Sequence, residues 1–211
     1  MKSLRYVQSL LIVSAAAFAF AQGAQQQSAS EPATAPKAAA AGSASQASAT
    51  PSEAQQAFKK LKTLDGTWEG KVTADIPIEK NPLAKEPMVV TLRTTSRGNA
   101  LMHEMTSKAT PDDPITMFYL DGDQLMLTHY CDAGNRPRMV GKISPDGNSI
   151  EFEFTDVTGN MKYGHMHHAK ITFIDADHHT EDWTFMVPKG AVHAHFDLHR
   201  TKSADQQASK G

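Results

Sequence analysis

Two short stretches decide the fold of this chain: Gly66-Thr67-Trp68 and Phe196-Asp197-Leu198-His199-Arg200. Between them lie about ten short runs that alternate apolar and polar residues, as strands with one buried face do. A Trp at the start of the first strand and an Arg at the end of the last predict a sheet that closes on itself, with the guanidinium stacked on the indole face. We call this predicted contact between Trp68 and Arg200 the latch.

The runs between the two stretches predict an antiparallel meander. Turn residues such as Asp121-Gly122 and Arg97-Gly98-Asn99 separate them, and Gly, Asn and Asp accept positive φ angles. No run of helical length intervenes, and parallel pairing needs long crossovers. The expected fold class is therefore all-β, an antiparallel up-and-down barrel of about ten strands. The predicted strands are 66–74, 87–97, 99–107, 115–120, 124–130, 137–144, 149–156, 164–174, 180–187 and 192–200.

One helix is expected before the barrel, over residues 52–64. Ser52 and Gln55 have the spacing of a capping box. The apolar residues Ala54, Ala57, Phe58, Leu61 and Leu64 recur at helical period, so one face of the helix should be buried against an end of the barrel.

The two ends of the chain differ in composition from the folded part. Residues 1–21 have a positive start, a short apolar run and a small-residue cleavage pattern, which predict a signal peptide and an exported protein, periplasmic or secreted. Residues 22–51, rich in Ala, Ser and Gln, and the tail 203–211 bury too little apolar surface to order themselves. The barrel domain is therefore expected over residues 52–202, with no transmembrane segment after cleavage.

Loop lengths predict that the two ends of the barrel differ. In a meander alternate connections share an end, and those after the second, fourth, sixth and eighth strands are short. Those after the first, third, fifth and seventh strands are longer, and residues 75–86, which carry two prolines, are long enough to act as a lid. The latch falls at the tightly closed end, and a ligand would enter at the long-loop end.

Strand parity directs several histidines into the barrel. His129, His165 and His167 share the parity of apolar neighbours near the long-loop end, and His103 does so near mid-barrel. His193, His195 and His199 have outward parity on the last strand, and His178 and His179 are expected in a surface turn.

Three interpretations of the inward histidines remain open. They could contact a small apolar or amphiphilic ligand or a haem iron, with Tyr130 and Arg138 at the rim. Alternatively, His129, His165 and His167 could bind zinc or copper, in a metal-binding protein or a metal-dependent enzyme. They could also form a hydrogen-bonded network in a structural barrel that binds nothing. The lone Cys131 near His129 supports no convincing nucleophile, and a net charge of −2 without a basic stripe argues against nucleic acid.

Several motifs carry a resemblance to a known group of proteins. Together they resemble a family of exported bacterial domains of unknown function with a lipocalin-like barrel, and the resemblance spans Leu64 to Arg200. The Gly66-x-Trp68 start and the terminal Arg200 look like the calycin pattern. More loosely, the domain is similar to nitrobindin-type haem barrels, whose first strand has more glycine than Lys71-Val72 provides here. The motifs are Leu64-Asp65-Gly66-Thr67-Trp68-Glu69-Gly70, Phe118-Tyr119-Leu120-Asp121-Gly122-Asp123, Thr128-His129-Tyr130-Cys131, Asn135-Arg136-Pro137-Arg138-Met139 and Gly164-His165-Met166-His167.

Overall fold

The computed structural model of the protein describes residues 50–76, 86–109 and 112–203. The predicted signal peptide, nearly all of the predicted linker, most of the predicted tail and most of the lid segment lie outside the described residues. Among the residues that are described, no helix is long and apolar enough to cross a membrane.

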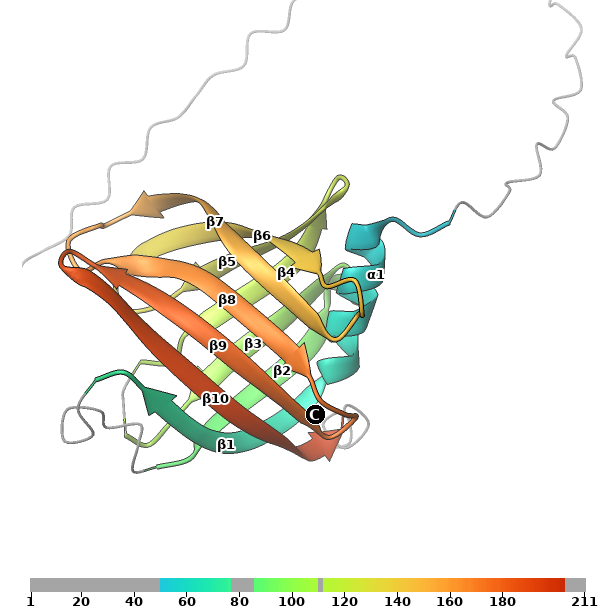
Figure 1. Ribbon diagram of the computed structural model, residues 1–211, viewed down its shortest axis with the longest axis horizontal. Helices are drawn as coiled ribbons and strands as arrows, with labels where there is room; N and C mark the ends of the chain where they lie inside the picture. The colour runs from blue at the N-terminus through green and yellow to red at the C-terminus, as the bar shows by residue number, and fades with distance from the viewer. Residues whose placement is uncertain (1–49, 77–85, 110–111, 204–211) are drawn as a thin grey trace, which may run out of the picture. The chain divides into compact units, whose positions relative to one another are not determined.

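The described residues form a closed antiparallel barrel of ten strands, each paired with its neighbours in the chain, and β1 pairs with β10 to complete the ring (Figure 1). The predicted up-and-down barrel with one N-terminal helix is confirmed. The strands are β1 (Gly66–Ala74), β2 (Met88–Thr95), β3 (Ala100–Thr106), β4 (Ile115–Asp121), β5 (Gln124–Tyr130), β6 (Asn135–Ile143), β7 (Ser149–Gly159), β8 (His165–Phe173), β9 (His178–Val187) and β10 (Gly190–Ser203).

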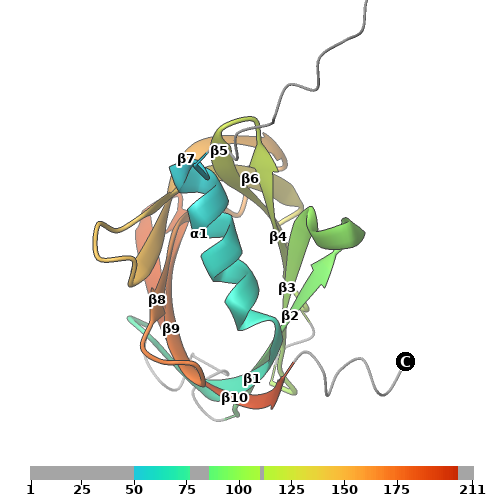
Figure 2. The same ribbon diagram turned by 90° about the vertical axis from the view of Figure 1, so that its right-hand side faces the viewer.

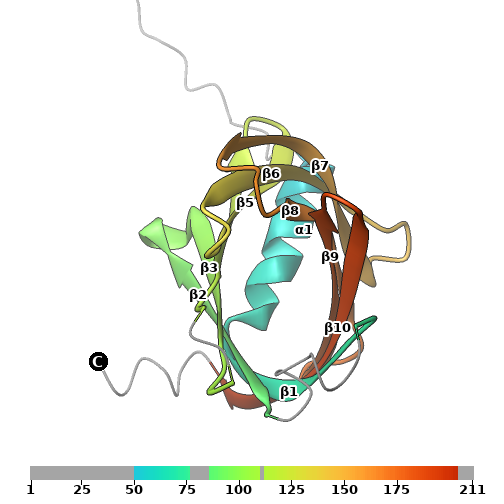
Figure 3. The ribbon, with the colours of Figure 1, turned by 90° about the vertical axis from the view of Figure 1, so that its left-hand side faces the viewer.

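Helix α1 (Glu53–Leu61) precedes the barrel and continues into a short 3-10 turn, η1 (Lys62–Leu64). The predicted capping box is present, because Ser52 accepts from the Gln55 backbone and the Gln55 side chain accepts from the Ser52 backbone. The apolar face of α1 is buried against the barrel. Figure 2 shows α1 lying across one end of the barrel, and Figure 3 shows it behind the strands when viewed from the opposite end.

The latch closes the barrel at the end that α1 covers. The Arg200 guanidinium lies 4.0 Å from the centroid of the Trp68 ring. Arg200 also donates to the carbonyl oxygens of Thr63, Asp65 and Ala176, which joins the helix end, the first strand and the β8–β9 turn. Gly66 is required here, since its φ is +145° and an added Cβ would lie 2.5 Å from Arg200 Nη1.

Inward side chains of alternating strand residues, together with the apolar face of α1 and η1, fill this closed half of the barrel. The fully buried large residues include Trp68, Phe118, Phe152, Leu61, Leu64, Leu92, Leu101, Leu125, Leu127, Met139, Ile150 and Ile171. Gly141 belongs to the same packing, because the Phe152 ring occupies the space a Cβ would need. At about 25 cal/mol per Å² of apolar surface, such burial is the main source of stability.

Candidate functional site

A buried carboxylate lies inside the barrel, above the apolar core. Glu181 of β9 is fully buried and accepts hydrogen bonds from three side chains. His103 Nε2 lies 3.0 Å from Glu181 Oε2, His179 Nε2 lies 3.1 Å from Oε1, and Trp183 Nε1 donates to Oε2 over 2.9 Å. We call these four residues the Glu181 layer.

Electrostatics keep Glu181 ionised although burial opposes its charge. Burial alone raises the pKa of Glu181, but the charge and hydrogen bonds of His103 and His179 outweigh it and hold that pKa well below its usual range. An ionised carboxylate only accepts, so both imidazoles donate through Nε2. Their Nδ1 atoms are buried without a hydrogen-bond partner among the described residues. The Glu181 layer thus holds an ionised carboxylate inside the barrel with three side-chain donors.

Sequence reasoning placed one member of this layer, His103, inside the barrel and missed the other three. His179 was expected in a surface turn, and that prediction is wrong: β9 begins at His178, and His179 is fully buried against the edge of the Trp68 ring. Strand parity is the signal that could have revealed Glu181. It lies two residues from Trp183, so both side chains leave β9 on the same, inward face. His103 is inward as predicted, but its Nε2 contacts Glu181 and it does not line the pocket described next.

A cavity of about 190 Å³ lies beyond the Glu181 layer, at the predicted long-loop end. Trp183 belongs to both the Glu181 layer and the cavity lining, because it lines the cavity while its Nε1 donates to Glu181. Most of the lining is apolar, and four polar residues interrupt it. The described lining residues are Met105, Asp112, Pro114, His129, Cys131, Asp132, Met166, Trp183, Phe185, Val192, Ala194 and Phe196.

His129 is the buried polar group of this cavity. It is 2% exposed, and burial together with the nearby His103 lowers its pKa from 6.5 to about 4. The imidazole is therefore neutral at physiological pH. Its Nδ1 lies 2.8 Å from Thr116 Oγ1, whereas its Nε2 has no hydrogen-bond partner within the described residues.

The partner of His129 assigns its tautomer. The buried Thr116 hydroxyl makes no other side-chain hydrogen bond in the described part of the chain, and leaving its proton without an acceptor would be costly. Thr116 therefore donates to Nδ1, and the proton of the neutral ring resides on Nε2. A ligand in the cavity would meet an N–H donor.

Acidic groups lie at the loop side of the cavity. The Asp132 backbone donates to Asp112 Oδ1 over 3.2 Å. Burial and the charge of Asp132 raise the pKa of Asp112. Burial also raises the pKa of the Cys131 thiol, and the two aspartates add to that effect. This side of the cavity is unfavourable for an anion and keeps the thiol protonated.

His165 and His167 do not line the cavity, contrary to the sequence prediction. The cause is a β-bulge between Met166 and His168, which pairs Met166 with Phe185 and turns Met166 to the cavity wall. The two histidines are half-buried instead. His165 Nε2 lies 3.2 Å from His167 Nδ1, and both rings pack on Phe154.

Two rim residues predicted from sequence also lie elsewhere. Tyr130 is 42% exposed and does not line the cavity. Arg138 is exposed and makes a two-pronged contact with Asp156, with its Nη2 2.6 Å from Asp156 Oδ2. The hydrogen bond and charge of Asp156 raise the pKa of Arg138. That pair cross-links β6 to β7 and does not contact the cavity.

The predicted metal triad is not assembled. Within the described residues, groups of three close donor atoms are formed by His178, Asp197 and His199, and by Glu151, Glu153 and His168. Neither group includes His129, His165 or His167. Haem does not fit this cavity either, because it measures about 190 Å³ and pockets for drug-sized ligands already measure about 300–1,000 Å³.

Comparisons with known proteins support the fold and do not extend to function. No family model matches the chain, and no curated protein matches it. Among solved structures, it is similar to Rv2717c from M. tuberculosis, with a TM-score of 0.51 and 16% identity over 69% of this chain and 97% of that one. A second match, to a DUF3598-family protein of unknown function from Nostoc punctiforme, has a TM-score of 0.37 and 12% identity. It covers 67% of this chain and 48% of that one.

Proposed function

We propose that this protein binds a small, mainly apolar molecule in the cavity at the long-loop end. The observation that carries the proposal is one buried N–H donor, His129 Nε2, in a cavity of about 190 Å³ with otherwise mostly apolar walls. Enclosed apolar pockets with a few convergent polar groups are the usual form of ligand sites. The proposal assumes an exported protein, as the N-terminal sequence predicts.

The cavity sets the ligand's size and chemistry. A space of roughly 150 Å³ holds a benzene-sized molecule, so the cavity, which opens to solvent, takes a ring of that size. His129 Nε2–H favours a ligand with one acceptor, such as a carbonyl oxygen. The carboxylates of Asp112 and Asp132 favour a neutral ligand over an anion.

Three matched probes test this chemistry by titration calorimetry. We expect acetophenone to bind about fivefold more tightly than ethylbenzene, because one hydrogen bond contributes about 1 kcal/mol. Benzoate should bind most weakly. Equal affinity for all three probes would show that His129 and the aspartates do not select the ligand.

A cavity-filling variant tests the location. Ala194 lines the cavity, whereas Ala191 of the same strand is exposed. Ala194→Phe should abolish acetophenone binding, and Ala191→Phe should leave it unchanged. Unchanged binding in Ala194→Phe would place the probe elsewhere. If none of the probes binds the wild-type chain, the result would favour the hypothesis of a structural barrel that binds nothing.

A further inference from the structure

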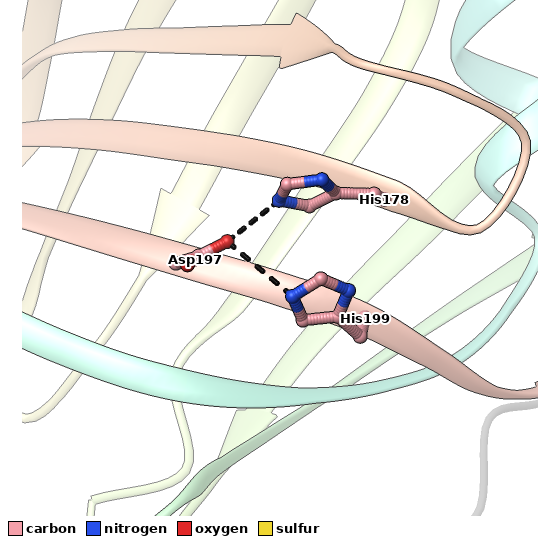
Figure 4. Close-up of side chains that lie close together, drawn as sticks. All are labelled: His178, Asp197 and His199. Atoms are coloured by element: carbon pink, nitrogen blue, oxygen red, sulfur yellow. Dashed lines mark hydrogen bonds and ion pairs between the residues drawn. The ribbon is translucent and has the colours of Figure 1, made fainter.

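The outer face of the barrel carries a second cluster of histidines, remote from the cavity. His178 of β9 is paired directly with His199 of β10. Asp197 precedes His199 by two residues, so both side chains leave β10 on the same face. Figure 4 shows the two imidazoles and the carboxylate converging on the outside of these strands.

The three side chains already lie close to one another. His178 Nε2 is 2.7 Å from Asp197 Oδ1, and His199 Nε2 is 3.7 Å from the same oxygen. The two rings are stacked, with centroids 4.2 Å apart and planes 20° from parallel. One donor atom from each residue lies within 4.8 Å of the other two. Ligands bonded to one zinc ion at about 2.0–2.2 Å lie roughly 3–4 Å apart, so small side-chain rotations suffice.

We propose that His178, Asp197 and His199 form a binding site for a transition-metal dication, of which Zn²⁺ is the probe. Two imidazole nitrogens and one carboxylate oxygen are a ligand set that Zn²⁺ and its neighbours prefer, whereas Mg²⁺ and Ca²⁺ prefer oxygen alone. The metal would take the Nε2 lone pair of each neutral ring, whose one proton would lie on Nδ1. His178 must therefore give up the Nε2 proton that it shares with Asp197.

Neighbouring charges are compatible with a bound dication. The hydrogen bond from His178 lowers the pKa of Asp197, so the carboxylate is ionised at neutral pH. On the adjacent strand β1, Glu69 is paired with His199 and Lys71 with Asp197. Glu69 and Lys71 have opposite charges, so these two residues add no net charge beside the site, and the charge of Asp197 remains to attract the metal.

The site would also hold the barrel together beside the latch. His178 and His199 adjoin His179 and Arg200 in the chain, and both of these neighbours contact the Trp68 ring. A metal bridging β9 to β10 at this point would bind the native sheet and not the unfolded chain. Its binding would therefore raise the melting temperature.

Calorimetric titration of the full-length chain, without an added polyhistidine tag, tests the site. We expect one Zn²⁺ per chain in the wild type and no binding of Mg²⁺. His178→Asn and His199→Asn should each weaken Zn²⁺ binding by at least about tenfold. His195→Asn is the matched control, because His195 is exposed on the same strand face and is paired with one carboxylate, Asp182, at 2.6 Å.

A second readout separates binding at this site from folding defects. Zn²⁺ at 100 times its Kd should raise the melting temperature of the wild type and of His195→Asn by roughly 5–10 °C. The two ligand variants should melt like the wild type without metal and gain little from Zn²⁺. Unchanged Zn²⁺ affinity in His178→Asn and His199→Asn would overturn the proposal. So would a loss of Zn²⁺ binding that occurs only in His168→Asn, because His168 belongs to the other cluster, with Glu151 and Glu153.

Discussion

The closed end and the long-loop end of the barrel are built from the same strands but are packed to different degrees. At the closed end the rings of Trp68, Phe118 and Phe152 are fully buried, and α1 and the latch cover them. At the long-loop end Met166 and Ala194 are only partly buried and line a cavity. The Glu181 layer separates the two. One end therefore supplies most of the packing that stabilises the barrel, while the other retains a cavity, as expected when stability is not uniform across a structure.

Breaking the Glu181 layer should have the largest effect. Glu181→Gln leaves the shape unchanged but removes the charge that accepts from His103 and His179, so we expect a loss of about 3–5 kcal/mol in the free energy of unfolding. Urea unfolding measures it. Glu151→Gln is the control, since Glu151 is exposed and hydrogen-bonded to His168, and it should change stability by less than about 1 kcal/mol. Equal losses in both variants would show that the buried Glu181 carboxylate contributes no more to stability than the exposed Glu151 carboxylate.

Removing the latch should weaken the closed end alone. Arg200→Ala loses a cation–π contact and hydrogen bonds from a charged group, which together amount to about 3–4 kcal/mol. Acetophenone affinity should be unchanged, because the latch lies below the Glu181 layer. Arg138→Ala, which breaks an exposed ion pair, should cost less than about 1 kcal/mol. Selective loss of probe binding in a well-folded Arg200→Ala variant would contradict the comparison.

The long-loop end should make its own contribution to the pH dependence of stability. The pKa of His129 falls from 6.5 in the unfolded chain to about 4 in the folded one, so the unfolded chain binds the proton first as pH falls. The contribution is present above pH 6.5 and is lost between pH 6.5 and 4, by about 3 kcal/mol. Urea unfolding across this range measures it.

A double variant isolates the contribution of His129 from those of other groups. Thr116→Val with His129→Phe removes both partners of a buried hydrogen bond, which can be nearly neutral for stability. Its free energy of unfolding should vary less between pH 6.5 and 4 than that of the wild type. Parallel curves for the two proteins would mean that His129 is protonated alike in the folded and unfolded states.

The smallest expected effect concerns Cys131 at the cavity. Burial raises the pKa of its thiol, so its thiolate fraction at pH 8 is below that of a free cysteine. Reaction with Ellman's reagent should therefore be slower than for free cysteine and should accelerate above pH 9. Saturating acetophenone should slow it further. A rate that acetophenone does not change would place the probe away from Cys131.

Much of the architecture was predictable because it depends on local pattern. The alternation of polarity predicts β1 and β5 with their observed bounds, and Ser52 with Gln55 predicts the capped start of α1. Parity also predicts that His103 and His129 are buried inside the barrel. These residues lie on strands whose alternation continues without a bulge up to each histidine.

Prediction failed where pairing between strands departs from simple alternation. The bulge between Met166 and His168 inserts one residue into β8, and a shift of one residue changes the face that each side chain occupies. Sequence polarity could not reveal it, because His165, Met166 and His167 are all tolerated on either face near the barrel end. The early start of β9 likewise brought His179 inside.

By itself, the sequence determined that the sheet closes, where the latch lies and which end carries the long loops. These features follow from alternation, turn residues and loop lengths, which are local or depend only on chain order. Only the tertiary structure decided which polar groups meet. His103 and Glu181 lie 78 positions apart, and the outer pair His178 and His199 is set by the register of β9 against β10. Such contacts depend on register and on bulges, which arise from the packing of the whole barrel.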